Sequence, residues 1–424
     1  MIFLYTIFCF LILIIGRLRY KNFFNPICLY TLVWFVAVCI HQSGLIEFYQ
    51  LTRFCWIVIF ISHFLFVGGC ILGCFVIAKK DSEAQYGYVD ETLQKQELLK
   101  GIVLTMSLAG IAIIANLKTM VAVYGFNLFE KIVRIYADRM YDLETIETIP
   151  YLGSFMFIAL PLLGCYLKKY GFHFIVIPCV ILVCANSLIS GGRAGIIFSL
   201  LLFLAGYFSM ENGVRMDPKG RKIFLILCSL AFVSMIVFIS QERTLGVSLT
   251  YATNDYVNIF GNNIALYKGL VYIAGPIGTL NEYLKTCDFN FGQNTFLTIY
   301  NILAKFGLCD RINQYQEYFV TPVICNVGTW VREIIEDFTL FGAVIFIPAF
   351  GFLSSFFYIA AVEKKYIANK IVWSAFAMVI ILSFFDWKFR ASNIWIAVFF
   401  GYLIGSYIDR KSFVFSKEGG EDDG

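Results

Sequence analysis

The sequence has little charge and almost no histidine. Only 15% of its 424 residues are Asp, Glu, Lys or Arg, and it contains 3 histidines; a typical soluble domain has about 25% charged residues. It contains no Cys-x-x-Cys pair, no Cys/His metal spacing, and no zinc-protease, Gly-x-Ser-x-Gly or P-loop motif. These absences argue against a soluble protein, a zinc enzyme and a P-loop nucleotide enzyme, and we expect neither a metal nor a cofactor.

Long apolar runs dominate what is present, since 59% of the residues are hydrophobic. Such runs are typical of an all-α, polytopic integral membrane protein. The first run lacks a basic n-region and a cleavage site, so we interpret it as a retained span. About eleven spans are predicted, roughly at 2–15, 27–40, 55–78, 101–115, 151–167, 172–188, 194–210, 223–240, 338–361, 371–385 and 394–408.

The distribution of Lys and Arg predicts the orientation. One set of alternate short loops holds more than half of the 33 basic residues, and the positive-inside rule makes that set cytoplasmic. The N-terminus then lies outside and the C-terminus inside. The net charge of +4 reports topology in this chain, so no nucleic-acid partner is expected.

We expect one membrane domain, residues 1–408, followed by a cytoplasmic, disordered tail, 409–424. External loops are predicted at about 116–150 and 241–337, the second between spans 8 and 9. Within them, 130–141 has the pattern of an amphipathic helix on the membrane surface. The apolar stretch 256–284 contains Asn, Lys and Glu and is interrupted by Gly275-Pro276, which favours short interfacial or re-entrant helices.

A turn between two apolar runs is the sharpest candidate for anion binding. Residues 190–195 are Ser-Gly-Gly-Arg-Ala-Gly. Ser190 is expected to cap the second helix, and Gly191 and Gly192 leave its N-terminus open to close approach. Backbone N–H groups, the helix dipole and the Arg193 guanidinium would then meet at one spot, which suits a phosphate or diphosphate. The alternative is an interfacial arginine whose head group reaches water.

Arg193 lies on the predicted outer side, and Arg243, Arg332 and Arg390 are at span ends on the same side. Because arginine binds phosphate oxygens in a bidentate fork, the four are predicted to hold a lipid diphosphate. Their convergence is an inference, because they are far apart in the sequence. For Arg332 the alternative is an ion pair along a helix with Glu336, four residues later.

Carboxylates on the outer side are the candidates for a general base. They are Asp255, Glu282, Glu333, Glu336 and Asp337. The last two lie at the start of a predicted span, near the lipid headgroups, and are therefore predicted to be catalytic.

Histidine is nearly excluded as a base, because only His41 lies at an outer span end, where we expect an interfacial residue. Most of the 13 cysteines lie in apolar runs. A disulfide within the long external loop stays open among Cys287, Cys309 and Cys325.

Several motifs, in this order, resemble the Wzy-type O-antigen polymerases, the family of oligosaccharide repeat-unit polymerases. They are Asn-Ser-Leu-Ile-Ser-Gly-Gly-Arg-Ala-Gly (186–195), Gly-Pro-Ile-Gly-Thr-Leu-Asn-Glu-Tyr-Leu (275–284), Phe-Gly-Gln-Asn-Thr-Phe (291–296) and Glu-Asp-Phe-Thr-Leu-Phe-Gly (336–342). The resemblance implies a metal-independent, inverting glycosyltransferase in the bacterial inner (cytoplasmic) membrane. It would polymerise undecaprenyl-diphosphate-linked oligosaccharides at the outer face, with arginines holding the diphosphates. Its partners would be lipid-linked donor and acceptor, membrane lipids, and in some systems a chain-length regulator and a flippase.

Three alternatives stay open. An O-antigen ligase would share the fold and the arginines and transfer finished polymer to lipid A core. A flippase or other transporter would carry charges within its spans and an internal repeat, and the sequence shows neither. A structural partner in an envelope complex would tolerate substitution of the external arginines.

Overall fold

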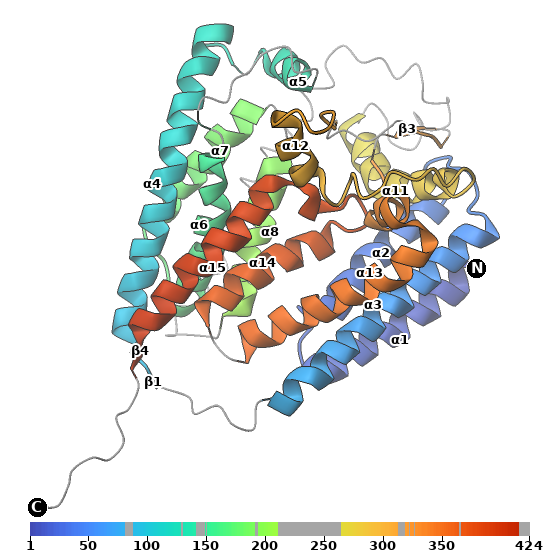
Figure 1. Ribbon diagram of the computed structural model, residues 1–424, viewed down its shortest axis with the longest axis horizontal. Coiled ribbons are helices and arrows are strands. Elements are labelled where there is room, and N and C mark those ends of the chain that lie inside the picture. The colour runs from blue at the N-terminus through green and yellow to red at the C-terminus, as the bar shows by residue number, and fades with distance from the viewer. Residues whose placement is uncertain are drawn as a thin grey trace, which may run out of the picture. The chain divides into compact units, whose positions relative to one another are not determined.

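The computed structural model describes residues 1–80, 88–128, 130–140, 149, 151–190, 194–210, 264–312, 319–321, 323–325, 327–363 and 366–414. Nearly all of its regular structure is helical (Figure 1). The α-helices are α1 (Ile2–Tyr20), α2 (Pro26–Gln42), α3 (Arg53–Lys80), α4 (Glu91–Tyr124), α5 (Ile132–Met140), α6 (Met156–Tyr170), α7 (Val176–Ser190), α8 (Ala194–Ser209), α11 (Ile264–Tyr283), α12 (Leu297–Lys305), α13 (Trp330–Val362), α14 (Ile367–Ile381) and α15 (Ser392–Ser412).

Short 3₁₀ turns and strands complete the described elements. The 3₁₀ turns are η1 (Leu152–Phe155) and η2 (Lys388–Arg390). Strand β1 (Tyr88–Val89) pairs antiparallel with β4 (Phe413–Val414), so that Tyr88 faces Val414. Strand β2 (Phe319–Val320) pairs antiparallel with β3 (Ile324–Cys325), so that Phe319 faces Cys325.

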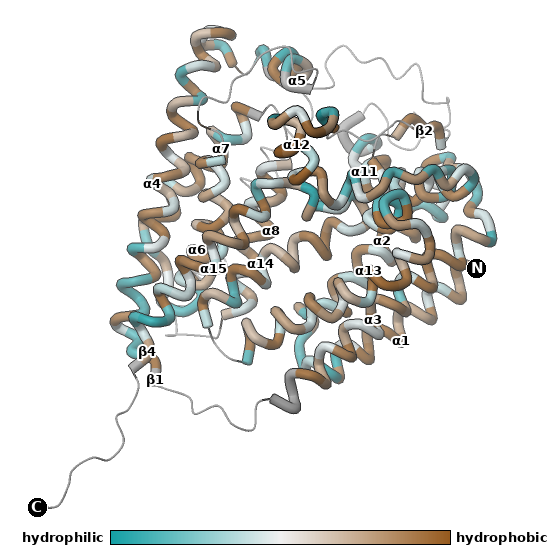
Figure 2. Tube along the Cα trace, in the orientation of Figure 1, coloured by the Kyte–Doolittle hydropathy of each residue, from teal (hydrophilic) through white to brown (hydrophobic). Residues whose placement is uncertain are grey.

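Five described segments are long and apolar enough to cross a membrane. They are Ile2–Tyr20, Arg53–Val76, Glu91–Tyr124, Leu152–Tyr170 and Trp330–Val362. Four shorter apolar helices are α2, most of α7, α8 and α14. Figure 2 shows hydrophobic residues along most of α1, α3 and α13. The expected class, an all-α membrane protein, is therefore confirmed.

Each predicted span among the described residues overlaps a helix, and the predicted span 223–240 lies outside them. The largest differences from expectation concern α4 and α11. Helix α4 runs from the Asp90 cap to Gly125, so residues 91–100 and 116–124, both predicted as loop, are helical. The Asp90 carboxylate accepts hydrogen bonds from the N–H groups of Thr92 and Leu93, and Gly125 ends the helix at φ 77°. The expected amphipathic helix at 130–141 is observed as α5.

Helix α11 is a second difference, because it continues through Gly275-Pro276 instead of breaking there. The segment that follows α11 in the sequence packs against the helix at this point. The Thr279 hydroxyl donates to the carbonyls of Pro276 and Val327, at 2.8 and 2.9 Å. A Cβ on Gly275 would lie 2.9 Å from Cys325 Sγ, so the β2–β3 hairpin lies directly against this turn. These contacts hold α11 on both sides of Pro276, although neither of them replaces the backbone donor that proline lacks.

The described chain forms two compact units. Unit 1 comprises Met1–Cys74, Val233–Phe356 and Phe376–Trp395, and unit 2 comprises Phe75–Phe232, Phe357–Ala375 and Ile396–Gly424. The expectation of one membrane domain stays a prediction.

Unit 1 is held together by close helix contact and by a buried aromatic core. A Cβ on Gly69 of α3 would lie 2.0 Å from the Pro348 carbonyl oxygen of α13, and one on Gly351 would lie 2.2 Å from the Phe66 carbonyl oxygen. Small residues at such positions let the backbones of membrane helices touch. The core contains Trp330, whose indole N–H donates to the Tyr30 hydroxyl at 3.3 Å.

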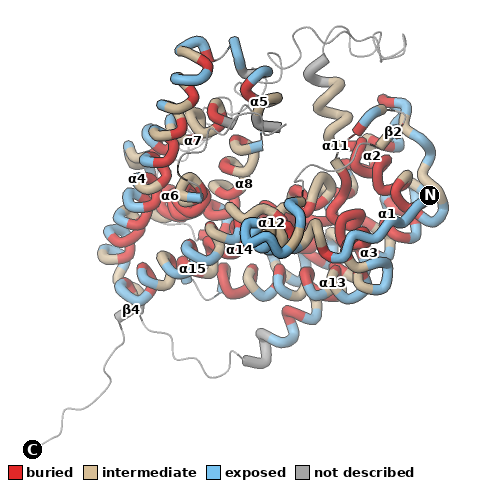
Figure 3. The backbone as a smooth tube through the Cα atoms, turned by 45° about the horizontal axis from the view of Figure 1, so that its top comes forward, coloured by how far each residue is buried: buried red, intermediate tan, exposed pale blue. Residues whose placement is uncertain are grey.

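Unit 2 uses the same kind of contact. A Cβ on Gly206 of α8 would lie 2.3 Å from the Pro161 carbonyl oxygen of α6, and one on Gly164 would lie 2.3 Å from the Phe203 carbonyl oxygen. Helix α6 is buried along most of its length, whereas α12 of unit 1 is largely exposed (Figure 3). At one end of unit 2, the Asp409 carboxylate accepts hydrogen bonds from the N–H groups of Ile367 and Ala368 and so caps α14.

Candidate functional site

A break near the start of α13 separates its charged residues from its apolar part. Thr339 has φ 62° and ψ 178°, a region that is essentially restricted to glycine. Residues 330–338 therefore form a separate short helix, which we name the charged half-helix. The remainder, 340–362, is long enough to cross a bilayer alone, since a crossing needs about 20 residues. The predicted span 338–361 thus starts at this break.

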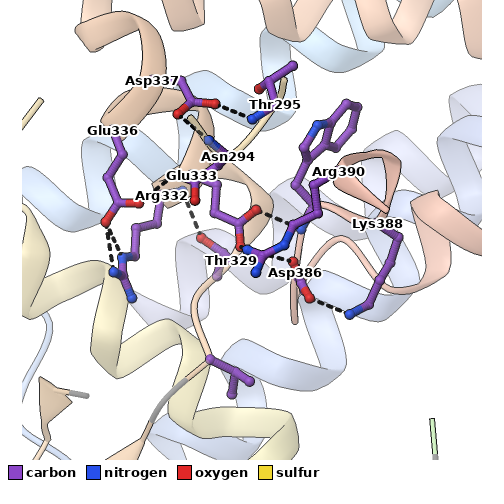
Figure 4. Close-up of polar contacts among 12 residues, drawn as sticks. Asn294, Thr295, Thr329, Arg332, Glu333, Glu336, Asp337, Asp386, Lys388 and Arg390 are labelled. Atoms are coloured by element: carbon purple, nitrogen blue, oxygen red, sulfur yellow. Dashed lines mark hydrogen bonds and ion pairs between the residues drawn. The ribbon is translucent and has the colours of Figure 1, made fainter. Parts of the chain in front are cut away.

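The charged half-helix contains Arg332, Glu333, Glu336 and Asp337, which are 2%, 0%, 5% and 1% exposed. Buried charges are stable only when they are paired and hydrogen-bonded. Two groups of partners meet this need, one around Arg332 and one around Glu333 (Figure 4). Together with Asp386, Lys388 and Arg390, these residues form what we call the charged cluster.

Arg332 and Glu336 form the first group. Arg332 Nε and Nη2 lie 2.8 and 2.7 Å from Glu336 Oε1, so the ion pair considered from the sequence is confirmed. The guanidinium also lies 4.5 Å from the Phe319 ring centroid and 5.6 Å from that of Tyr283. Arg332 Nη1 is buried and has no hydrogen-bond partner among the described residues. Arg332 Nη1 is therefore a buried donor whose hydrogen bond the described residues do not satisfy.

Glu333 and Arg390 form the second group, which joins α13 to η2. Arg390 Nη1 lies 3.1 Å from Glu333 Oε1 and 3.7 Å from Asp386 Oδ1. The backbone N–H of Trp387 donates to Glu333 Oε2 at 3.3 Å, and Lys388 forms an ion pair with Asp386 Oδ2. Burial alone would raise the pKa of Asp386, but the charges of Lys388 and Arg390 outweigh it and lower the pKa to about 2. Asp386 is therefore ionised at neutral pH.

A loop over the end of the charged half-helix fixes Asp337. Its Oδ1 and Oδ2 accept hydrogen bonds from the N–H groups of Asn294 and Thr295, at 2.9 and 2.6 Å. The Asn294 side chain also donates to Glu336 Oε2 at 2.9 Å. The N–H groups of Asn290 and Gly292 reach the carbonyls of Glu336 and Asp337, at 2.7 and 3.2 Å. The motif 291–296 thus caps this helix end.

The strain at Thr339 gives a direct stability prediction. Its side chain is exposed, so replacing Thr339 with glycine removes few contacts and relieves a backbone strain of about 1–3 kcal/mol. Glycine loses more conformational entropy on folding, which offsets about 0.5–1 kcal/mol of this relief. The free energy of unfolding is therefore expected to rise by about 1 kcal/mol. Thermal unfolding of the purified protein measures it. Thr6→Gly in the regular helix α1 is the control and should lower the unfolding temperature; a lower value for Thr339→Gly would contradict the strain.

The predicted site residues have different outcomes. Arg332, Arg390, Glu336 and Asp337 belong to one cluster, whereas Arg193, Arg243, Gly191 and Gly192 lie outside the described residues. Ser190 is the last residue of α7 rather than the residue preceding α8. His41, expected at an interface, is 3% exposed, with its ring stacked on Phe48 at 4.7 Å. Cys287, Cys309 and Cys325 carry free thiols.

Sequence reasoning missed Asp386 and Lys388 as members of the cluster, and the amide of Asn294. A usable signal was the run Asp-Trp-Lys-Phe-Arg at 386–390, which places three charges within an otherwise apolar stretch. Glu333 was one of several candidate carboxylates, and only its burial and partners distinguish it.

The charge balance limits what the cluster does alone. Arg332 and Arg390 are each already engaged by a carboxyl group, Glu336 and Glu333 respectively, and burial together with the neighbouring Asp386 raises the pKa of Glu333 well above its usual value. The arginines are thus fixed in ion pairs, and a bound anion requires further positive charge.

No three His, Cys, Asp or Glu side chains in the described part of the chain are arranged to hold a metal ion. No family model, curated protein or solved structure matches this chain.

Proposed function

We propose that this chain is a bacterial inner-membrane polymerase of undecaprenyl-diphosphate-linked oligosaccharides. In this proposal it spans the membrane about eleven times, with the N-terminus outside and the C-terminus inside. The charged cluster then faces the outer side. The reaction transfers the growing glycan from its lipid diphosphate to the sugar of a new lipid-linked unit, with inversion at the anomeric carbon.

The observation that carries the proposal is the buried, half-used fork of Arg332. Glu336 engages Nε and Nη2 and fixes the guanidinium plane, while Nη1 has no partner among the described residues. A buried donor without a partner is costly. A phosphate oxygen of a ligand would satisfy it and would gain a charge-assisted hydrogen bond.

The chemistry needs a stabilised leaving group. When the anomeric C–O bond breaks, negative charge develops on the lipid diphosphate. Guanidiniums that are fixed before the reaction stabilise this charge without reorganising. Because Arg332 and Arg390 are already ion-paired within the charged cluster, Arg193 and Arg243 would supply the additional positive charge. Two lipid-linked substrates held in one site would also react faster through proximity.

The test is a gel of surface polysaccharide from the bacterium that carries this gene. Arg193→Ala and Arg332→Lys are each expected to lower polymerisation by about 10²–10³-fold, so the ladder should collapse to core plus one repeat. Arg332→Lys keeps a positive charge opposite Glu336 but removes the fork. Arg53→Ala removes an exposed arginine and should leave the ladder unchanged. Membrane levels of each variant are measured in parallel.

The other outcomes identify the alternatives. Loss of every repeat from the core, with lipid-linked polymer accumulating, would favour a ligase. Repeat units trapped on the inner leaflet would favour a flippase. An unchanged ladder after deletion of the gene would overturn the proposal.

A further inference from the structure

Large apolar side chains are exposed along α12 and on both sides of it, in a part of unit 1 that the sequence predicts as an external loop. Ile299, Ile302 and Phe306 are three and four residues apart, so they share one face of α12 and of the residue that caps it (Figure 3). Together with three neighbours they form what we call the apolar stripe, which consists of Phe291, Phe296, Ile299, Ile302, Phe306 and Leu308. A contiguous apolar surface of this kind marks an interaction site.

The other face of α12 is turned toward the protein and carries polar side chains. The Thr298 hydroxyl donates to the Arg390 carbonyl at 3.1 Å, and the Asn301 side-chain oxygen accepts from the Ile312 N–H at 3.3 Å. A helix on the surface of a soluble domain has the reverse arrangement, with its apolar face on the core and its polar face in water. The orientation of α12 therefore suits apolar surroundings.

The apolar stripe is continuous with the exposed apolar surface of a candidate membrane span. The Phe296 ring lies 6.0 Å from the Phe338 ring, and the Gly292 N–H donates to the Asp337 carbonyl at 3.2 Å. Directly beyond these contacts α13 continues as its apolar part, where the exposed side chains include Leu340, Phe341, Val344 and Ile345. Whatever medium covers this end of the span thus extends over the stripe.

Length and charge narrow the partner further. Helix α12 has 9 residues, whereas a crossing needs about 20, so α12 does not span the membrane. Residues 288–311 contain two basic residues, Lys305 and Arg311, and two acidic ones, Asp288 and Asp310. Because their charges cancel, the segment has no net attraction for anionic headgroups. Burial of apolar area is the driving force that remains.

We infer that the apolar stripe is inserted into the hydrocarbon edge of the bilayer, at the end where the apolar part of α13 begins. Helix α12 is then an interfacial helix, and its partner is the acyl chains of the surrounding lipids. The inference does not rest on the proposed function. It has a consequence for the charged cluster: because Thr298 contacts Arg390, the cluster lies at the level of the lipid headgroups.

The test places one fluorophore at a time on the full-length protein in phosphatidylcholine vesicles. A genetically encoded azidophenylalanine replaces Phe306, and the fluorophore is attached to its azide, which leaves the cysteines unchanged. Two exposed aromatic residues of unit 1 are the matched references, Phe341 in the apolar part of α13 and Tyr49 between α2 and α3. Quenching is measured with a nitroxide on the lipid acyl chain and with iodide in the water.

The nitroxide is expected to quench the fluorophore at 306 as strongly as the one at 341. Iodide should quench it about tenfold less than the one at 49, because ions are excluded from hydrocarbon. Ile302 is probed in the same way, so that the test stands if one of the two variants does not fold.

Two results would overturn the inference, and both leave the proposed function intact. Iodide quenching equal to that at 49 would place the stripe in water. Quenching by neither reagent would mean that another part of the chain, or a second copy of it, covers the stripe in place of lipid.

Discussion

Replacing Arg390 with methionine is expected to destabilise unit 1 by about 3–5 kcal/mol, because it removes the cation that the buried Glu333 and Asp386 side chains share. Arg390 Nη1 lies 3.1 Å from Glu333 Oε1, and these side chains are 10% and 0% exposed. The substitution removes the charge but keeps a flexible side chain of similar length. The loss of stability is measured by heating the protein in detergent and quantifying, by size-exclusion chromatography, the fraction that stays folded.

Two further variants separate the charge effect from lost packing. The double variant Arg390→Met, Glu333→Met removes both charges and should recover most of the loss, because a buried ion pair replaced by apolar groups is often neutral. Lys100→Met breaks the 2.6 Å ion pair with Glu97, but the Lys100 side chain is 70% exposed. That change should cost less than about 1 kcal/mol. A double variant as unstable as Arg390→Met would show that packing dominates.

Adding one methyl group at Gly68 or at Gly69 should change stability in opposite directions. A Cβ on Gly69 would lie 2.0 Å from the Pro348 carbonyl oxygen, and backbone atoms cannot rotate away. Gly69→Ala is therefore expected to push α3 and α13 apart and to cost about 3 kcal/mol, the upper end of typical overpacking. The neighbouring Gly68 has nothing within 4 Å of its Cβ position. Gly68→Ala should stabilise the protein by about 0.5–1 kcal/mol through helix propensity.

Unfolding temperatures of the two alanine variants, measured side by side, decide this prediction. Because both glycines lie in the same helix, differences in insertion and in helix propensity largely cancel. The close contact between α3 and α13 would be contradicted if the two variants had the same unfolding temperature.

The sequence predicts the helices well because an apolar run in lipid must satisfy its own backbone hydrogen bonds. It predicts their ends less well. The break at Thr339 carries neither glycine nor proline, and the loop 287–296 that caps the charged half-helix comes from elsewhere in the chain. The packing of α11 next to Pro276 likewise involves a hairpin that follows it in the sequence.

The candidate site was predictable in its residue types but not in its pairing. Arg332 and Glu336 are four residues apart on one helix, and their ion pair followed from spacing alone. The pairing of Glu333 with Arg390 joins distant segments, and no local pattern indicates it. The glycine contacts could be predicted in part. Gly69 and Gly73 have the small-xxx-small spacing, but the partner helix is known only from the structure.

The break at Thr339 also bears on the order in which the protein is assembled. A charged residue at the centre of an inserting helix costs about 2.5–3.5 kcal/mol, so a continuous helix from 330 that carried its charges into the bilayer would insert poorly. With the break, 340–362 can enter the membrane as an apolar unit while the charged half-helix stays at the surface. The half-helix is then buried only when the 287–296 loop and η2 dock on it. We therefore expect the charged site to form after its neighbouring span is in place, as a late step of folding.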